Sequence, residues 1–198
     1  MSHETDRGKI KLWTRQNKGI LRDLEEYGVY RVRREYIEEK LDTIAPFYLK
    51  AYKWYTERAA QIVSKPKEVQ YPIWLSTTEN MMLQPTEDSV VLELEVDREY
   101  VVITDQEKWG YVINYWYVPL DREDEKKHNE ELKKYGIFDE SALCMGGKGN
   151  FYPLLRNKIK KSWDRLFDNN IRLCNLTQAT LWEIRKDWIV NIVHYEEN

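Results

Sequence analysis

Residues 178–184 are Gln-Ala-Thr-Leu-Trp-Glu-Ile, and residues 188–195 are Trp-Ile-Val-Asn-Ile-Val-His-Tyr. Both runs are rich in aromatic and β-branched side chains, which favour extended structure. The polar residues 185–187, Arg-Lys-Asp, separate the two runs. This part of the chain therefore predicts a pair of closing strands.

Further strands are expected toward the N-terminus. Residues 89–96 alternate apolar and charged side chains from Val91 on, with Glu93 and Glu95 on the wet face, as in a half-buried strand. A tight turn at 97–98 and a strand over 100–104 follow. Shorter strands are expected over residues 10–14, 29–33 and 71–78. Because hairpin-like pairs dominate, we expect an α+β fold with a split or mixed antiparallel sheet and peripheral helices.

Helix signals lie between these strands. Asn17 and Gly28 bracket a helix over 18–27, as a candidate N-cap and a C-terminal glycine. Pro46 divides the next helical stretch, because an internal proline removes a hydrogen bond and clashes with the preceding turn. We therefore expect separate helices over 34–43 and 46–63, a helix capped by Asp105, and a helix over 151–167.

The composition suits one soluble globular domain. The chain has 198 residues and a net charge of −3, and 33% of its residues are charged. We expect one domain over residues 10–198, after a disordered tail at 1–9 and with a charged insertion or loop region at 121–150. No apolar run reaches membrane length and the first residues do not resemble a signal peptide, so we expect no membrane partner and a cytoplasmic location.

Metal and phosphate motifs are missing from the sequence. The two cysteines and three histidines do not have ligand spacing, so no metal site is expected. Residues 146–149, Gly-Gly-Lys-Gly, lack the spacing of a phosphate-binding loop, and we expect a flexible loop over 142–150. The basic side of the helix over 151–167 contacts nucleic-acid phosphates, faces water or offsets the acidic segment 121–140.

Five separated motifs occur in a characteristic order. They are Lys11-Leu-Trp-Thr14, Tyr71-Pro-Ile-Trp74, Asp105 with Trp109 and Asn114, Ser162-Trp163 with Leu166-Phe167-Asp168, and Gln178-Ala-Thr-Leu-Trp-Glu-Ile184. Together they resemble the bacterial and phage domain-of-unknown-function family numbered 3841, over residues 10–195. That family carries no assigned activity.

A more distant resemblance implies a function. The chain resembles the mono-ADP-ribosyltransferases, whose split sheet surrounds an NAD cleft. That resemblance implies NAD as cofactor and possible transfer of ADP-ribose to a macromolecule. By analogy, Thr14 with Arg15 or Arg31 holds the nucleotide, Trp74 or Trp109 forms a stacking wall, and Gln178 orients the ribose. The implied cofactor-binding residues are Trp13, Thr14, Arg15, Arg31, Trp74, Ser76, Thr77 and Trp109, and the implied catalytic residues are Gln178, Thr180 and Glu183.

One departure from this family leaves the activity open. The late strand of these enzymes carries Gln/Glu-x-Glu, and its last glutamate stabilises the positive charge that develops on the ribose. Here the triplet is Gln178-Ala-Thr180, and a threonine cannot supply that charge. Glu183 is the only nearby acid, and on a regular strand it points to the face opposite Thr180. The alternative is a non-enzymatic accessory module that binds a protein or a nucleic acid.

Overall fold

A computed structural model describes residues 8–196, which form two compact units. Within the described residues, the first unit contains residues 8–40, 55–103 and 178–196, and the second contains residues 41–54 and 104–177. The four boundaries fall inside helices α2 (Arg34–Leu41) and α3 (Ala45–Ala59) and inside strands β5 (Val102–Asp105) and β6 (Thr177–Leu181). Each unit is thus assembled from segments that are far apart in the sequence. The expectation of one domain over residues 10–198 stays a prediction.

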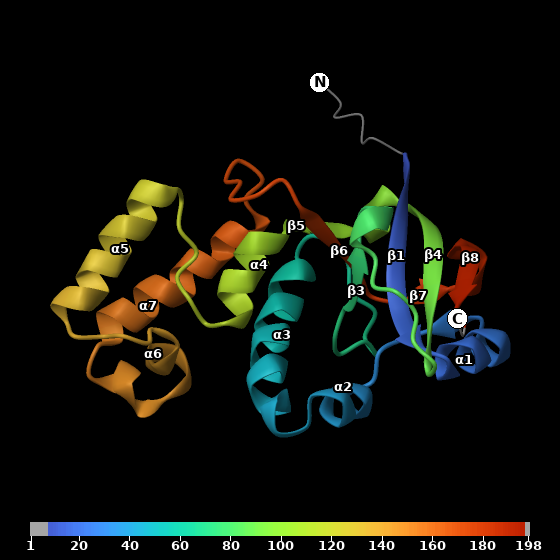
Figure 1. Ribbon diagram of the computed structural model, residues 1–198, viewed down its shortest axis with the longest axis horizontal. Coiled ribbons are helices and arrows are strands. Elements are labelled where there is room, and N and C mark those ends of the chain that lie inside the picture. The colour runs from blue at the N-terminus through green and yellow to red at the C-terminus, as the bar shows by residue number, and fades with distance from the viewer. Residues whose placement is uncertain (1–7, 197–198) are drawn as a thin grey trace. The chain divides into compact units, whose positions relative to one another are not determined.

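A six-stranded sheet has the strand order β5-β6-β3-β1-β4-β8 (Figure 1). Besides β5 it contains β1 (Lys9–Asn17), β3 (Ile73–Ser76), β4 (Ser89–Asp97), β6 (Thr177–Leu181) and β8 (Ile189–His194). Strands β1 and β4 pair antiparallel over their full lengths, from Lys9 opposite Asp97 to Asn17 opposite Ser89. The pairs β1–β3, β3–β6 and β4–β8 are antiparallel as well. The predicted α+β class with an antiparallel sheet is confirmed.

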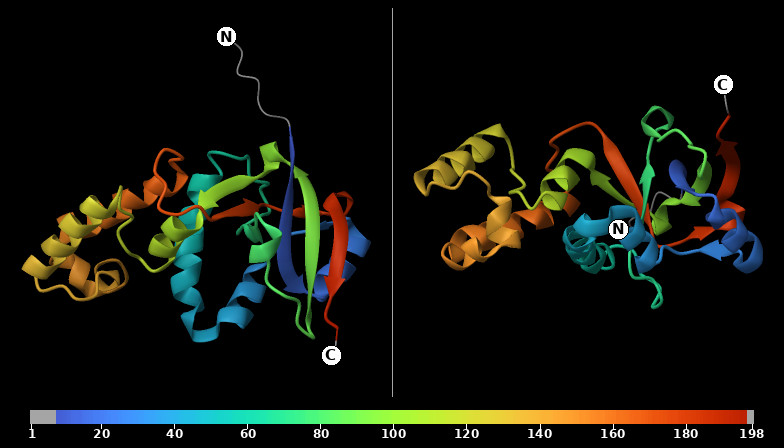
Figure 2. Two further views of the ribbon diagram at one scale, coloured as in Figure 1. Left: turned by 45° about the horizontal axis from the view of Figure 1, so that its top comes forward. Right: turned by 60° about the horizontal axis from the view of Figure 1, so that its bottom comes forward.

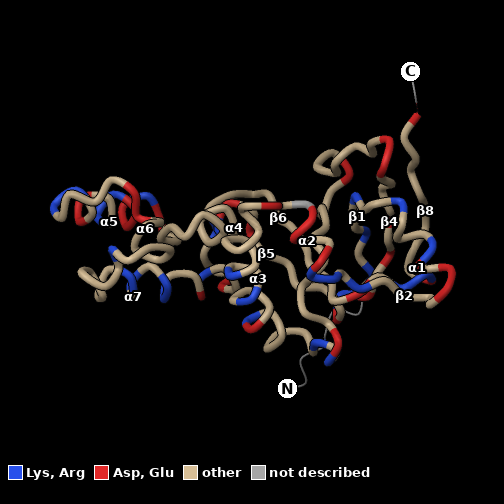
Figure 3. Tube along the Cα trace, turned by 90° about the horizontal axis from the view of Figure 1, so that it is seen from below, with Lys and Arg blue, Asp and Glu red and all other residues tan. Residues whose placement is uncertain are grey.

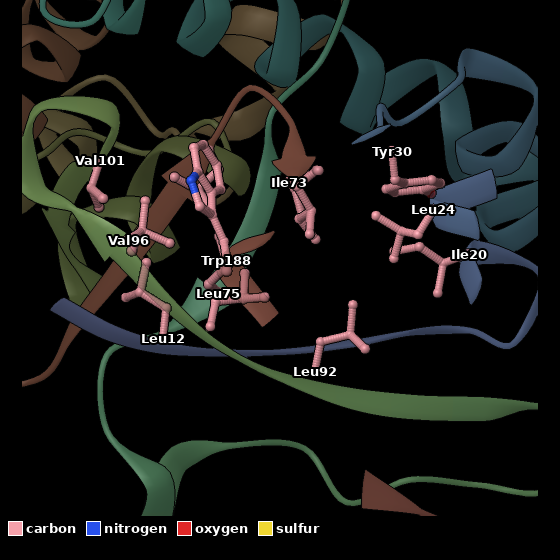
Figure 4. Packing of buried hydrophobic residues seen from close by; sticks show 14 of the residues in the cluster. Leu12, Ile20, Leu24, Tyr30, Ile73, Leu75, Leu92, Val96, Val101 and Trp188 are labelled. Carbon is pink, nitrogen blue, oxygen red and sulfur yellow. The ribbon is translucent and has the colours of Figure 1, made fainter. Parts of the chain in front are cut away.

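The core of the first unit lies against one face of this sheet. Strand alternation places Leu12 of β1 and Leu92 and Leu94 of β4 on that face, and all three are fully buried. Figure 4 shows Leu12 and Leu92 with Ile20 and Leu24 of α1 (Gly19–Tyr27). Burying one such side chain is worth about 1.5–3 kcal/mol. The opposite face carries charge, and Lys11 donates to Glu93 at 2.9 Å.

Helix α1 begins and ends as its sequence predicts. The Asn17 side chain accepts a hydrogen bond from the Gly19 amide at 2.9 Å. At the other end Gly28 has a φ of 70°, and its amide donates to the Leu24 carbonyl at 3.0 Å. This left-handed conformation suits glycine because it has no Cβ. The chain then enters β2 (Val29–Tyr30).

The predicted strands exist, but two of the expected pairings are wrong. A 3₁₀ turn over Arg98–Tyr100 replaces the tight turn after β4, and three strands separate β4 from β5 in the sheet. Three strands also separate β6 from β8, so the closing strands are not neighbours. Figure 2 shows β8 beside β4. Between β6 and β8, strand β7 (Ile184–Arg185) pairs with β2 in a separate two-stranded ribbon. The alternation of apolar and polar residues predicts a strand but does not predict which strand pairs with it.

The division of the 34–63 region at Pro46 is confirmed. Helix α2 (Arg34–Leu41) and a 3₁₀ turn over Asp42–Ile44 precede α3, whose second residue is Pro46. A proline is tolerated there because the first helical amides lack an intrahelical partner.

The second unit is mainly helical, with α4 (Gln106–Ile113), α5 (Arg122–Lys134), α6 (Ser141–Met145) and α7 (Pro153–Ser162). Asp105 caps α4 as predicted, because its carboxylate accepts from the Lys108 amide at 3.0 Å. The expected loop over 142–150 is wrong in part, since it contains most of α6 and a 3₁₀ turn over Gly147–Asn150. No helix in residues 8–196 is long and apolar enough to cross a membrane.

The charged segment 121–136 forms helix α5, and the basic side of α7 offsets its acids. Lys158 of α7 donates to Glu131 of α5 at 2.6 Å, and Arg165, just past α7, donates to Asp124 at 3.0 Å. The segment is not solvated all round, because His128 and Leu132 are buried. For Lys158 and Arg165 this pairing supports the offset of the acidic segment, whereas Lys161 forms no ion pair within the described residues.

Candidate functional site

The β2–β7 ribbon brings two predicted site residues together. Val29 lies opposite Arg185 and Tyr30 lies opposite Ile184. The residues that flank these pairs, Arg31 after β2 and Glu183 before β7, are therefore neighbours although 152 positions separate them. No local sequence motif links the two.

The Glu183 carboxylate is held by two arginines. The Nε and Nη2 atoms of Arg31 donate to its Oε2 at 3.0 and 2.8 Å. The Nε atom of Arg185 donates to its Oε1 at 2.9 Å. Burial alone would raise the pKa of Glu183, but the hydrogen bonds from Arg31 and Arg185 outweigh burial and hold this pKa below its ordinary value. Glu183 is thus an ionised anchor whose two oxygens are both engaged.

Arg185 is fixed by aromatic rings as well as by Glu183. Its guanidinium lies 5.3 Å from the centre of the Tyr100 ring and 5.0 Å from that of Trp188. The two rings are themselves 5.4 Å apart. Cation–π contacts of this kind add to the ion pair and restrict the arginine further. The Arg31–Glu183–Arg185 cluster is therefore a well-ordered part of the first unit.

A cavity of about 470 Å³ lies beside the ribbon, within the first unit. Its wall combines the end of α1, the segment that follows β2 and the loop before β3. Three arginines and three carboxylates share this wall with an aromatic ring and an amide. The lining residues are Asp23, Tyr27, Val29, Arg31, Val32, Arg33, Arg34, Glu35, Glu68 and Gln70.

The three cavity arginines differ in how fully they are engaged. Arg31 uses its Nε and Nη2 atoms on Glu183, and its Nη1 has no partner among the described residues. Arg34 pairs with Glu38 on α2 at 2.8 Å. Arg33 lies 5.9 Å from the centre of the Tyr36 ring and forms no ion pair in the described part of the chain. Arg33 is thus the cavity cation with most hydrogen-bonding capacity left for a ligand.

The predicted residues on the central strands divide between the two faces of the sheet. Trp13 lies opposite Ser76, and Ser76 lies opposite Gln178, so these three side chains share one face. Thr14, the next residue on β1, points to the other face. It donates to the Trp74 carbonyl at 2.9 Å. The structure therefore does not bring Thr14, Ser76 and Gln178 to one cleft.

Several of these residues have packing partners. Ser76 donates to the Met81 carbonyl at 2.9 Å, and Arg15 donates to the Gln84 carbonyl at 3.1 Å. Thr180 shares a 2.8 Å hydrogen bond with the buried Tyr55, whose ring lies 4.8 Å from that of Trp74. These bonds fix the loop after β3 and the last turns of α3.

The remaining predicted residues lie away from the cavity wall. Thr77 follows the end of β3 and is partly buried. Trp109 belongs to the second unit, where it stacks on Tyr52 at 6.0 Å. The Nε2 atom of Gln178 is buried and has no partner among the described residues. The catalytic roles expected for Gln178, Thr180 and Glu183 stay predictions.

Most residues of the cavity wall were not predicted from the sequence to belong to a site. Of the residues expected to bind the cofactor by analogy, Arg31 is the one that lines this wall. The available signal was the run of cations at Arg31, Arg33 and Arg34, shortly after the helix-ending Gly28. Asp23, Glu35 and Glu68 gave no signal, because acids on amphipathic helices and loops are usually solvated. In residues 8–196, no group of three or more histidines, cysteines or acids has metal-site geometry.

The comparisons with known proteins identify a family without an activity. The family model described as "Domain of unknown function (DUF3841)" matches residues 11–190. No curated protein and no solved structure matches this chain significantly.

Proposed function

We propose that this chain, which belongs to the DUF3841 family, binds NAD or a related nucleotide in the cavity beside the β2–β7 ribbon. One observation carries the proposal. Arg31, positioned by the buried Glu183, and Arg33, which forms no ion pair among the described residues, share the wall of one cavity of about 470 Å³. Small-molecule sites are typically about 300–1,000 Å³ in volume.

The chemistry of the wall suits the parts of a nucleotide. Arginine guanidinium groups bind phosphate oxygens in planar, paired hydrogen bonds. Carboxylates accept hydrogen bonds from ribose hydroxyls, and Glu35 and Glu68 are exposed on this wall. The exposed Tyr27 ring offers a surface on which a base or a nicotinamide ring stacks. Equal numbers of cations and acids match a ligand that carries both phosphates and hydroxyls.

Glu183 acts in this proposal by positioning Arg31. A phosphate-binding arginine that is already held in place loses less side-chain entropy when the ligand arrives. Both Glu183 oxygens accept hydrogen bonds from arginines, and Glu183 does not line the cavity. For ADP-ribose transfer, the acid that supports the developing positive charge would be one of the cavity carboxylates, Asp23, Glu35 or Glu68.

Isothermal titration calorimetry of the full chain with NAD, ADP-ribose and nicotinamide mononucleotide tests the proposal. Arg33→Ala is the preferred variant, because removing Arg31 would also leave Glu183 without a partner. Loss of one charge-assisted hydrogen bond predicts that Kd rises at least about tenfold.

The matched control is Arg122→Ala, an exposed arginine of α5 in the second unit. It should bind like the wild type. Equal affinities for the two variants, or no heat of binding with any of the three ligands, would contradict the proposal.

A further inference from the structure

The second unit concentrates positive charge in a chain that is acidic overall. Residues 148–172 contain seven lysines and arginines and only two aspartates, whereas the whole chain carries a net charge of −3. Figure 3 shows basic positions along α7. A local field of this kind attracts polyanions even where the net charge is negative.

The charge lines a hollow of about 500 Å³ along α7. Three of its residues, Leu154, Lys158 and Lys161, are spaced by four and three positions and so lie on one face of α7, and Arg165 follows in the 3₁₀ turn Trp163–Phe167. The hollow is completed by Tyr117, Asn157 and Ser162. We call these seven residues the α7 groove.

Two cations of the α7 groove are held over an aromatic floor. Lys158 Nζ and the Arg165 guanidinium each lie 5.0 Å from the centre of the Tyr117 ring. Tyr117 in turn stacks on the buried His128 at 4.1 Å. The ion pairs with Glu131 and Asp124 fix these two cations further but offset part of their charge. Lys161 is exposed and forms no ion pair within the described residues, so it is the cation most available to a partner.

Two large apolar side chains near the start of α7 are exposed, and one of them, Leu154, lines the α7 groove. Leu154 is 84% exposed and Phe151, three residues before it, is 82% exposed. Lysine and arginine beside an exposed ring are the pattern of single-strand recognition, in which phosphates pair with cations and bases stack on rings. We propose that the α7 groove binds the phosphodiester backbone of a single-stranded nucleic acid, with a base stacked on Phe151.

Fluorescence anisotropy of the full chain with a labelled oligothymidine of about 12 nucleotides tests this assignment. The salt concentration is varied from about 50 to 200 mM. Lys161→Glu should raise Kd at least about tenfold at the lowest salt and reduce the steepness of the salt dependence. Phe151→Ala should weaken binding at least about fivefold and leave the salt dependence unchanged.

Lys126→Glu on α5 is the matched control, because it makes the same charge change at an exposed position outside the α7 groove. It should bind within about twofold of the wild type, the scale of a long-range charge effect. Equal losses in Lys161→Glu and Lys126→Glu, or no binding by the wild type at the lowest salt, would overturn the proposal. Competition by polyglutamate as effective as that by unlabelled strand would also overturn it, since it would indicate an acidic peptide.

The oligonucleotide experiment can fail without affecting the nucleotide proposal, and the reverse also holds. NAD binding, measured by calorimetry on Lys161→Glu, should equal that of the wild type, because Lys161 lies in the second unit and does not line the nucleotide cavity. A defect confined to the oligonucleotide therefore concerns the α7 groove alone.

Discussion

At the scale of single residues, the contacts of Glu183 explain a position that the sequence presents as a candidate catalytic acid. Two arginines from separate parts of the chain donate to both of its oxygens. A buried carboxylate that keeps its charge needs such donors, since desolvation otherwise favours the neutral form. The same contacts that preserve the charge of Glu183 hold Arg31 and Arg185 in place.

Replacing this charge tests the importance of the cluster. Glu183→Gln keeps the size of the side chain but removes the counter-charge of Arg31 and Arg185. Because the arginines are partly exposed, we expect the free energy of unfolding to fall by about 1–3 kcal/mol, measured by urea denaturation. Glu25→Gln removes the exposed ion pair to Lys186 and should change stability by no more than about 0.5 kcal/mol. Equal losses of stability in Glu183→Gln and Glu25→Gln would contradict a special role for Glu183.

The pKa of Glu183 also predicts a pH dependence. Its folded-state pKa lies below the ordinary value of 4.5, so ionised Glu183 stabilises the fold above that pH. This contribution is lost as the pH falls through the folded-state pKa. The stability difference between wild type and Glu183→Gln should therefore be constant above about pH 6 and shrink below about pH 5. Urea denaturation of both proteins across this pH range checks the prediction. A difference in the free energy of unfolding that grows as the pH falls would contradict it.

The sequence alone identified some of the residues at the candidate site. Arg31 and Glu183 were both candidates, the first as a phosphate clamp and the second as an acid near the late strand. Their pairing was not predictable, because it depends on a ribbon that joins positions 152 residues apart. The expected convergence of Thr14, Ser76 and Gln178 fails for a simple reason. Register and alternation place Thr14 on the other face of the sheet.

At the scale of elements, local signals predicted where segments begin and end. Asn17, Gly28 and Asp105 mark helix ends in the structure as they do in the sequence, because each acts on backbone groups within a few residues. Strand partners depend on distant segments, so β4 and β5 were expected to be neighbours although three strands separate them. Helix α6 escaped prediction because three glycines follow it closely.

The end of α1 offers a test at this scale. Gly28→Ala places a Cβ at a φ of +70°, which costs about 1–2 kcal/mol of stability although no atom lies within 4 Å of the added carbon. Gly110→Ala is the matched control, since its Cβ also meets nothing within 4 Å but the residue lies inside helix α4. That change should stabilise by about 0.5–1 kcal/mol. The Tm should fall in Gly28→Ala and rise in Gly110→Ala. A shift of both Tm values in the same direction would contradict the backbone argument.

At the scale of the whole molecule, the two compact units carry chemically different surfaces. The first holds a cavity with equal numbers of arginines and acids, and the second holds the more basic α7 groove. The net charge of −3 shows neither feature, because it is a sum over all residues and does not say which of them lie on the same surface. The overall charge therefore does not bear on local sites.

The most direct test of the nucleotide proposal compares two predicted ligand positions in the first unit. The full chain is titrated with ADP-ribose as wild type, Arg33→Ala and Gln178→Ala, and the heat of binding is measured. We predict that Arg33→Ala weakens binding at least about tenfold, while Gln178→Ala, outside the cavity wall, binds like the wild type. Loss of binding in Gln178→Ala with unchanged binding in Arg33→Ala would contradict the account and move the nucleotide to the late strand.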